Sequence, residues 1–422
     1  MSISGRLIRN CFILSLLLLS SSILVGSRRR AVDLPRTPTF NREVIRIVQE
    51  TCQSCHQTGE LGPFPLITYQ DAVKWAGRIH FMVSTRQMPP WKPEPGCGEF
   101  VGNRRLTDRE ISLIVDWIEG GMPEGRAEDL PPPRTFETGW LLGPPDAEIA
   151  IPQPYTPPDE RDMFRCFVLP VSFPEDRYLR AIDFLPLARE TVHHIIAYID
   201  TSGEAERLQA ADPDPGYESF GGPGFDAAGL LGGWFPGAAP PQLPDEVGIL
   251  LPANAKIVLQ IHYAPHHGHA MVDQTRMGLY FTRARPDRLF RFLSVENRDF
   301  TIPAGATDYR VTASMTLPSA IRAITAGTHM HLLGRQNRMI ATLPDGEEMC
   351  LIRIDDWDIH WQGMYSYADP PLLPAGTVIR IEAEYDNSAA NPKNPTSPPR
   401  DVSYGEEAAS EMCIGYIGYV EE

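Results

Sequence analysis

The stretch Lys256–Tyr263 has the sequence KIVLQIHY, a short apolar run with β-branched residues and a histidine near its end. Such runs are typical of β-strands, because β-branched side chains fit a pleated surface. Similar runs recur from residue 145 onward, separated by Pro, Gly and Asp clusters: Phe164–Leu169, Leu179–Phe184, His194–Ile199, Thr275–Thr282, Asp308–Met315, Ser319–Ala326, Arg338–Leu343, Glu348–Asp355, Thr377–Tyr385 and Cys413–Tyr419. The pattern predicts two all-β domains, each a jelly roll or sandwich, over residues 145–288 and 289–422.

Upstream of these runs the apolar spacing is that of helices. Asn41–Thr51 and Tyr69–Ser84 are helix candidates, and Thr107–Glu110 is a capping signature ahead of a third. We therefore expect an all-α domain over residues 36–125, followed by an extended Pro-rich linker over residues 126–144. A second Gly/Pro-rich stretch, residues 202–245, is expected to be an ordered loop because it carries Trp234 and Phe235.

The first 35 residues have the composition of a targeting segment. Arg6 and Arg9 precede an apolar run from Cys11 to Val25, which ends in small residues. The run is short for a membrane span, and three arginines follow it, so a cleaved signal peptide and a retained N-terminal membrane anchor both stay open. With either one, the haem motif described next predicts a periplasmic or secreted protein, since c-type haem is attached outside the cytoplasm. The net charge of -16 argues against nucleic-acid binding.

Cys52-Gln53-Ser54-Cys55-His56 is a CxxCH motif for covalent attachment of a c-type haem. Cys52 and Cys55 would form the thioethers and His56 the proximal ligand; a redox CxxC and half of a zinc site are the alternatives. Met88, in a Pro-rich loop between helices, is the candidate for the sixth ligand. His80 competes with it, and Met88 could also be a core residue. The order helix, CxxCH, helix, loop, helix resembles a class I cytochrome c.

Histidines and a methionine supply a second kind of site. His329 and His331 stand two apart, so on a strand they share a face and can converge on one ion. Neighbours on a strand point to opposite faces, so His193 and His194 can bind one metal only at a strand end or a bulge. The remaining candidates, each more often a core residue when taken alone, are His262 and Met412. Imidazole together with a thioether selects copper that cycles between Cu(I) and Cu(II), and it disfavours zinc.

These motifs, in their order along residues 145–422, resemble the copper type II, ascorbate-dependent monooxygenases, which include peptidylglycine α-hydroxylating monooxygenase and dopamine β-monooxygenase. The resemblance implies an electron-transferring copper on one ligand set: His193, His194 and His262. It implies an oxygen-activating copper on a second, catalytic set: His329, His331 and Met412. Tyr416, four residues after the methionine, matches a residue near the substrate in that family.

The chain departs from the peptide-hydroxylating member at two positions. Gly327 stands where that enzyme has an arginine for the substrate carboxylate, and Ile414 stands where it has an asparagine. A C-terminal peptide is therefore not the expected substrate. The resemblance implies hydroxylation of an activated C–H bond in a small organic substrate with O2. Electrons would pass through the haem from an external donor: a reduced cytochrome, a quinol-linked donor or an ascorbate-like reductant. A non-catalytic haem–copper electron-transfer or copper-binding protein is the alternative.

Four cysteines lie outside the haem motif and the targeting segment: Cys97, Cys166, Cys350 and Cys413. Their pairing is open on the sequence, and Cys350 with Cys413 is one candidate because both fall on strands of the last domain. His266, His267 and His269 are expected in a solvated loop. His360, beside Trp361, is expected to be structural.

Overall fold

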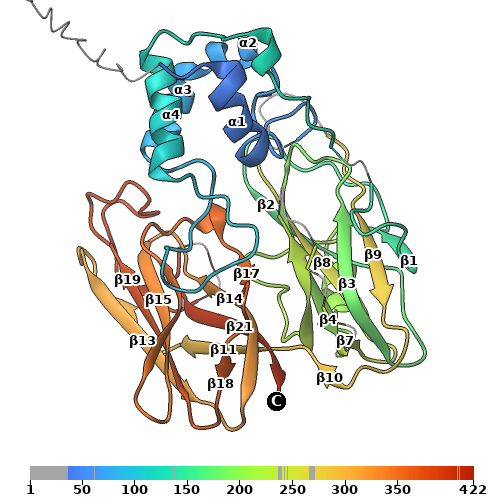
Figure 1. Cartoon of the computed structure of the whole chain (residues 1–422). Helices are drawn as coiled ribbons and strands as arrows, with labels where there is room; N and C mark the ends of the chain where they lie inside the picture. The colour runs from blue at the N-terminus through green and yellow to red at the C-terminus, as the bar shows by residue number, and fades with distance from the viewer. Residues whose placement is uncertain are drawn as a thin grey trace, which may run out of the picture. The chain divides into compact units, whose positions relative to one another are not determined.

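A computed structural model describes residues 37–60, 62–136, 139–235, 240–241, 243–244, 246–265, 271–405, 407 and 409–422. The predictions for residues 1–35 and for His266, His267 and His269 lie outside these residues. Within them, β-sandwich sheets account for most of the architecture, as the sequence predicts for residues 145–422, and helices are few (Figure 1). None of the helices in the described ranges is long and apolar enough to cross a membrane.

The longer helices of the N-terminal segment form close to where they are expected (Figure 1). Their bounds, with two short η turns, are η1 Phe40–Val44, α1 Ile45–Thr51, α2 Tyr69–Lys74, α3 Ala76–Ser84, α4 Asp108–Glu119 and η2 Ala127–Asp129. The capping box before α4 is present, with Thr107 and Glu110 bonded reciprocally. The helix expected over 69–84 is instead two helices, because Trp75 leaves the helical conformation and its ring stacks on Phe64 at 4.2 Å.

The first sandwich consists of two five-stranded sheets, ordered β1-β9-β3-β7-β10 and β5-β2-β8-β4-β6. Its strands are β1 Ala147–Ala150, β2 Met163–Val168, β3 Arg177–Leu185, β4 Val192–Asp200, β5 Tyr217–Glu218, β6 Gly229–Trp234, β7 Val247–Leu251, β8 Lys256–Tyr263, β9 Arg276–Phe281 and β10 Arg288–Leu289. The expected loop 202–245 is thus wrong in part, since it contains helix α5 (Glu204–Ala211) as well as β5 and β6. Trp234 enters the core on β6.

The second sandwich pairs a sheet ordered β11-β21-β14-β17 with one ordered β13-β19-β15-β16. The strands are β11 Arg291–Asn297, β12 Thr301–Ile302, β13 Tyr309–Thr316, β14 Ile321–His329, β15 Gly334–Thr342, β16 Glu348–Ile354, β17 Met364–Ser366, β18 Leu372–Leu373, β19 Val378–Tyr385, β20 Val402–Ser403 and β21 Cys413–Glu421. A short turn, η3 (Ile359–Trp361), precedes β17; β18 pairs with β14, and β12 pairs with β20.

Strand register decides which faces carry the candidate ligands. His194 is paired with His262, while the next pair, Ile195 and Ile261, belongs to the core between the two sheets of the first sandwich. Because successive side chains alternate in direction, the two histidines lie on the outer face of their sheet. His329 is paired with Ile414 in the second sandwich, and neighbouring Cys413 and Ala326 lie in its core. Both ligand sets therefore lie on outer faces.

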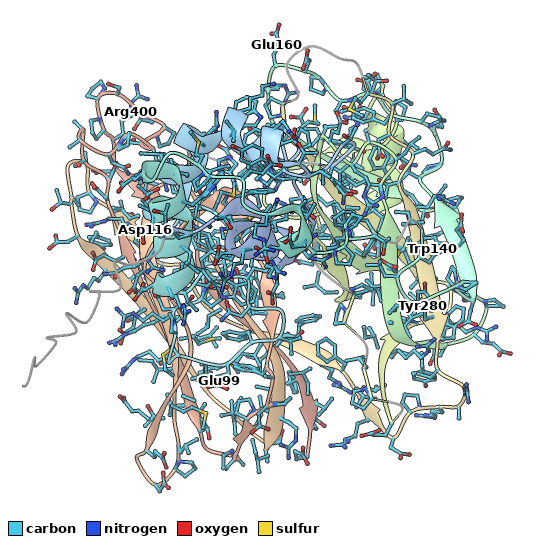
Figure 2. The ribbon with its side chains drawn as sticks, turned by 45° about the horizontal axis from the view of Figure 1, so that its top comes forward. Glu99, Asp116, Trp140, Glu160, Tyr280 and Arg400 are labelled. Atoms are coloured by element: carbon cyan, nitrogen blue, oxygen red, sulfur yellow. A yellow bond between two sulfur atoms is a disulfide. The ribbon has the colours of Figure 1, made fainter. Side chains whose placement is uncertain are left out.

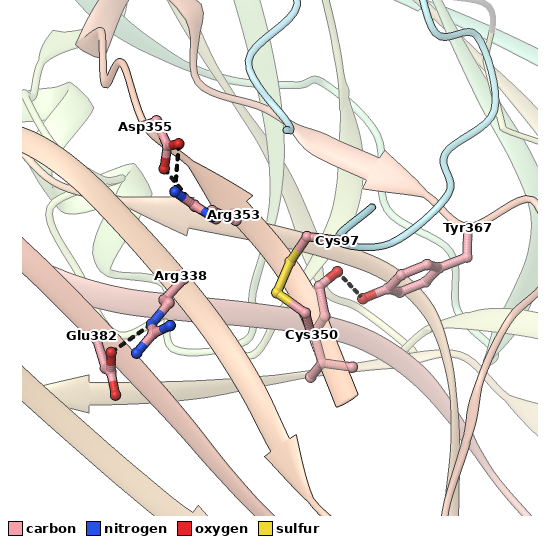
Figure 3. The surroundings of a disulfide bond; sticks show 8 residues. Cys97, Arg338, Cys350, Arg353, Asp355, Tyr367 and Glu382 are labelled. Atoms are coloured by element: carbon pink, nitrogen blue, oxygen red, sulfur yellow. Dashed lines mark hydrogen bonds and ion pairs between the residues drawn. A yellow bond between two sulfur atoms is a disulfide. The ribbon is translucent and has the colours of Figure 1, made fainter. Parts of the chain in front are cut away.

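Residues 91–101, here called the strap, join the N-terminal segment to the second sandwich. Cys97 forms a disulfide with Cys350 on β16 (Figure 3). The pairing of Cys350 with Cys413 is therefore wrong. Cys413 is wholly buried, on the core face of β21, whereas Cys350 lies on an edge strand that the strap can reach. Backbone hydrogen bonds add to the disulfide: Val101 N–H donates to the Ser366 carbonyl at 2.9 Å.

Candidate metal centres and haem motif

A β-bulge brings His193 and His194 together. The register of β4 on β8 shifts between Val192 and His194, which leaves His193 as the extra residue. A bulge re-aims the side chains beside it, so neighbouring residues can point to the same side. The strand irregularity that two adjacent ligands require is thus present at this position. The Nδ1 atoms of the two histidines lie 3.3 Å apart.

His262 completes a cluster of three buried imidazoles. Its Nδ1 lies 3.4 Å from Nδ1 of His194, and its Nε2 lies 2.6 Å from Oδ1 of Asp162. An ionised carboxylate can only accept, so Nε2 of His262 carries the proton and its Nδ1 presents a lone pair. The same hydrogen bond holds the pKa of Asp162 below its usual range. Carboxylates that orient ligand histidines in this way are typical of metal sites.

The spacing of the three Nδ1 atoms fits a metal ion better than it fits hydrogen bonding. Burial lowers the pKa of His193 to about 3 and the pKa of His194 well below its usual value, so the rings are neutral. A single proton on His194 Nδ1 cannot serve two neighbours at 3.3 and 3.4 Å well. For metal–nitrogen bonds of about 2.0–2.1 Å, the edge of a tetrahedron is about 3.3–3.4 Å. Two of the Nδ1–Nδ1 distances therefore match a tetrahedral edge, and the ligand atoms of all three histidines lie within 4.8 Å of one another, so the residues fit a metal ion.

The second cluster contains His329 and His331, whose ring centroids are 5.0 Å apart. His329 donates from Nδ1 to Oε1 of Gln362 at 2.6 Å, and His331 donates from Nδ1 to the Ser410 carbonyl at 2.9 Å. Each Nε2 therefore carries a lone pair. Both Nε2 atoms are buried, and neither has a hydrogen-bond partner among the described residues. Leaving buried polar atoms unpaired is costly, and a bound cation would remove that cost.

The strand does not extend through this motif as expected. β14 ends at His329, and Met330 and His331 follow it. Met330 turns into the core of the second sandwich and is 1% exposed. The two imidazole rings nonetheless lie 5.0 Å apart, and hydrogen bonds to Gln362 and Ser410 fix their orientations.

Met412 lies at the start of β21, beside the His329–His331 segment. The pairing of β14 with β21 ends at His329 and Ile414, so His331 and Met412 each lie two residues from that pair, at the same end of the sheet. Glu411 accepts from the backbone N–H groups of His331 and Leu333 at 2.8 and 2.6 Å, which ties the two segments together. Burial raises the pKa of Glu411 to about 8, and these N–H groups oppose that shift by donating to the ionised form.

Aromatic rings connect the two clusters. Phe164 stacks on His262 with centroids 4.1 Å apart, and Phe220 contacts Phe164 at 4.8 Å. Phe220 in turn lies 5.6 Å from the ring of His331. Trp361 of the second sandwich also reaches the first cluster, at 5.1 Å from His193. The two outer faces therefore confront each other, with the histidines between the sandwiches.

Tyr416 shares a sheet face with His329, because it is paired with Gly327 two residues before that histidine. Burial raises the pKa of its hydroxyl. Gly327 has no room for a side chain: a Cβ there would lie 2.5 Å from Sδ of Met364 and 2.8 Å from the Gly363 carbonyl oxygen. Met364 thus occupies the space that an arginine side chain at this position would need.

The CxxCH residues lie where α1 ends. His56 donates from Nδ1 to the Phe64 carbonyl at 3.0 Å, which leaves Nε2 as the nitrogen with a lone pair. Burial raises the pKa of Cys52 to about 11. Gly62 packs against this turn, since a Cβ there would lie 2.5 Å from the Cys55 carbonyl oxygen. An oriented histidine beside two cysteines fits covalent haem.

The two candidates for the sixth haem ligand differ in their surroundings. Met88 is half-buried in the loop after α3, and its N–H donates to the Met82 carbonyl at 3.2 Å. His80 points to the surface of the helices, where its Nε2 lies 3.2 Å from Glu119. Its side chain is therefore engaged between α3 and α4.

Several contributing residues carried no signal strong enough to be found from the sequence. Asp162 and Gln362 belong to irregular segments, and only the fold brings them against the histidines. Glu411 is different, because it stands directly before the candidate ligand Met412 in the sequence. His360 lies 6.4 Å from the His193 ring and is bonded to Asp358 at 3.0 Å.

No known family and no curated protein matches the chain. Among solved structures, PNGF-II is similar over 65% of this chain and 65% of its own, at 8% identity and a TM-score of 0.26. The major capsid protein P2 of bacteriophage PM2 is similar over 65% and 97%, at 8% identity and a TM-score of 0.23. The infectious bursal disease virus VP2 subviral particle follows, over 65% and 71%, at 9% and 0.19. Likenesses this weak carry no argument about function.

Proposed function

We propose that this protein is a copper-dependent monooxygenase that hydroxylates an activated C–H bond of a small organic substrate with O2. The observation that carries the proposal is that two separate groups of buried histidines present ring nitrogens suited to bind a metal. Three histidines in one sandwich could hold a metal ion, and the other sandwich has two buried, unpartnered Nε2 atoms on histidines whose rings lie 5.0 Å apart, with Met412 at the start of the neighbouring strand. Two separate sites, only one of them near a thioether, suit an electron store and an oxygen-reacting centre.

The chain's residues would divide the work as follows. His193, His194 and His262 hold the first copper, with Asp162 fixing the proton of His262 away from the metal. His329, His331 and Met412 hold the second, and Gln362 and Ser410 orient its imidazoles. When bound, the coppers supply one-electron steps between Cu(I) and Cu(II). Phe164 and Phe220 lie between the clusters, Phe164 against His262 and Phe220 against His331.

The N-terminal segment would be a cytochrome c-like domain that carries covalent haem on Cys52, Cys55 and His56, with Met88 as the sixth ligand. Its contact with the first sandwich supports a role as electron donor. Glu60, four residues after His56, lies 3.1 Å from Arg189, and Arg189 covers the ring of Trp234. A haem of this kind is attached outside the cytoplasm. The proposal therefore includes a periplasmic or secreted location, with residues 1–35 as signal peptide or membrane anchor.

The test begins with cofactor content. Purified protein should give a haem-stained band on a denaturing gel and two coppers per chain. Replacement of Cys52 and Cys55 by Ala should abolish the band, whereas Cys166→Ala, at a buried cysteine elsewhere, should leave it. One copper per chain, or stoichiometric zinc, would remove the two-site proposal.

Oxygen chemistry is tested at Met412. Met412→His should keep copper bound, because imidazole is also a good ligand, but should lower substrate-coupled O2 consumption by orders of magnitude. Met330→Leu is the matched control, since that methionine lies in the same region but packs in the core. If Met412→His keeps full activity, or if wild-type protein consumes no O2 with any reductant, the non-catalytic electron-transfer alternative replaces the monooxygenase.

A further inference from the structure

A cavity of about 300 Å³ opens beside His331. Its apolar lining comes from Leu332, Trp357 and Ile359, and its polar lining comes from Asp358, His360 and Lys393. This volume is at the lower end of the range for small-molecule pockets, which is about 300–1,000 Å³. None of the polar residues was expected from the sequence to take part in binding.

The residues that line the cavity differ in burial from one end to the other. His331 is 0% exposed and Trp357 is 2% exposed, so these two form its deep end. His360 and Lys393 are exposed and lie at its mouth. The unpartnered Nε2 atom belongs to the deep residue, His331. A molecule that entered here would place its outer end on polar groups and its inner end beside the second ligand cluster.

The mouth carries one carboxylate, Asp358, and one ammonium, Lys393, and the two differ in how far their hydrogen bonds are already used. Asp358 is already engaged, because its Oδ1 accepts from the backbone N–H and from Nδ1 of His360 at 3.1 and 3.0 Å. Lys393 donates to the Trp357 carbonyl at 3.0 Å. No described carboxylate lies close enough to the Lys393 ammonium to form an ion pair with it. An ammonium has three donors, so this one has both charge and hydrogen bonds to offer.

We propose that this cavity binds a small organic carboxylate, with its anionic end on Lys393 and its apolar end toward His331. The residue that recognises the carboxylate is then Lys393, on a different segment from Gly327, where Met364 leaves no room. The inference names the substrate class for the proposed monooxygenase and rests on that function for the reaction, but not for binding. The position oxidised would be remote from the carboxylate.

An amine is the competing ligand, since Asp358 also lines the cavity. The neighbouring Lys393 disfavours it, because its positive charge already acts on the Asp358 carboxylate and would repel an incoming ammonium. Three probes of matched shape separate the cases: phenylacetate, phenethylamine and phenethyl alcohol. Each is titrated calorimetrically into the full chain with haem attached, once loaded with copper and once after copper removal.

Phenylacetate should bind in both states and bind more tightly than the amine or the alcohol. Lys393→Gln should weaken it about tenfold or more, the loss expected for a charge-assisted hydrogen bond. Lys393→Arg should retain binding, and Lys256→Gln, a lysine of the first sandwich, should have no effect. Because Lys393 is exposed, these variants should fold, and thermal unfolding verifies that they do.

Three results would overturn the inference: preference for phenethylamine, phenylacetate binding that Lys393→Gln leaves unchanged, or no binding of any probe. Binding that Lys393→Gln leaves unchanged would show that the carboxylate coordinates copper directly. In that case phenylacetate would not bind after copper removal. Binding to the copper-free protein keeps the test separate from the proposed function. Should the chain hold no copper, Lys393-dependent binding of phenylacetate would still support the inference while the monooxygenase proposal failed.

Discussion

The backbone N–H groups of His331 and Met412 donate to the same carboxylate oxygen, Oε2 of Glu411, at 2.8 and 3.2 Å. The other oxygen, Oε1, accepts from Leu333 at 2.6 Å. One buried side chain thus sets the distance between the segment after β14 and the start of β21. Those two segments carry the ligands of the proposed oxygen-reacting copper.

Glu411→Gln should therefore disturb the second site more than the first. An amide has one oxygen, so at least one buried backbone N–H loses its acceptor, at a cost of about 1–3 kcal/mol in the free energy of unfolding. We expect copper content to fall from two per chain to one, as measured by metal analysis after reconstitution. Glu382→Gln, at an exposed pair with Arg338 in the same sandwich, is the control. Two tightly held coppers in Glu411→Gln would contradict the role.

Asp162 should matter for the first site in the same way. Its Oδ1 holds the proton of His262 on Nε2, and loss of such a partner typically weakens metal affinity by about 10–100-fold. Asp162→Asn should show that decrease at one copper only, in a competition titration with a chelator. Glu160→Gln removes the same charge two residues away, at a side chain that projects outward in Figure 2, and should leave both affinities unchanged. If both variants weaken copper affinity equally, the effect comes from the loss of a nearby negative charge and not from the hydrogen bond to His262.

The strands could be predicted from the sequence because their apolar runs and turn residues are local signals. The candidate ligands could be proposed because His193, His194, His329 and His331 stand in recognisable pairs. The groups that orient those ligands could not, since Asp162 acts on a residue one hundred positions away. A contact of that range depends on sheet pairing between β2 and β8, which no local pattern specifies.

Two wrong expectations have the same physical origin. The Cys350–Cys413 pairing assumed that cysteines on strands of one domain face each other, but the two strands lie in different sheets and Cys413 faces the core. The expected loop over 202–245 followed from its glycines and prolines. Its strand β6 forms because it can pair with β4 despite those glycines, and Gly232 has a positive φ of 139° at the bulge in that pairing.

Gly327 and Met364 are paired across β14 and β17, and their contact leaves no space for a Cβ at 327. Gly327→Ala should lower the free energy of unfolding by about 1–3 kcal/mol, the usual cost of overpacking. Met364→Ala should recover part of that loss in the double variant, because the Gly363 carbonyl still lies close. A double-mutant cycle by chemical denaturation measures the coupling. Strict additivity would show that Met364 does not fill this space.

The disulfide of the strap should stabilise the whole chain. Replacing Cys97 and Cys350 together by Ser should lower the free energy of unfolding by about 2–5 kcal/mol. Haem and copper content should not change, because the hydrogen bonds of the strap remain. Dithiothreitol should bring the wild type to the level of the variant and have no effect on the variant itself. A variant as stable as the oxidised wild type would mean that the strap is held without its disulfide.

The buried histidines make a prediction about acid stability in the metal-free protein. Burial lowers the pKa of His193 to about 3 and that of His329 to about 4, from an ordinary value of 6.5. Between those values and 6.5 the unfolded chain binds protons that the folded chain does not. Stability therefore falls as pH decreases through that window, by up to about 1.4 kcal/mol per pH unit for each histidine.

His360 should behave with the opposite sign. Its hydrogen bond to Asp358 raises its pKa, so the stability it contributes is present below 6.5 and is lost as pH rises through the folded-state value. Denaturation of the copper-free chain at pH 7 and pH 5 should thus show a shallower acid loss in His329→Gln than in the wild type, and a steeper one in His360→Gln. Copper binds only the neutral imidazoles of the folded state, so loading should raise stability at pH 7. If His329→Gln and the wild type lose stability equally on acidification, His329 is not held neutral by burial, and its Nε2 is not the unpaired acceptor on which the second site depends.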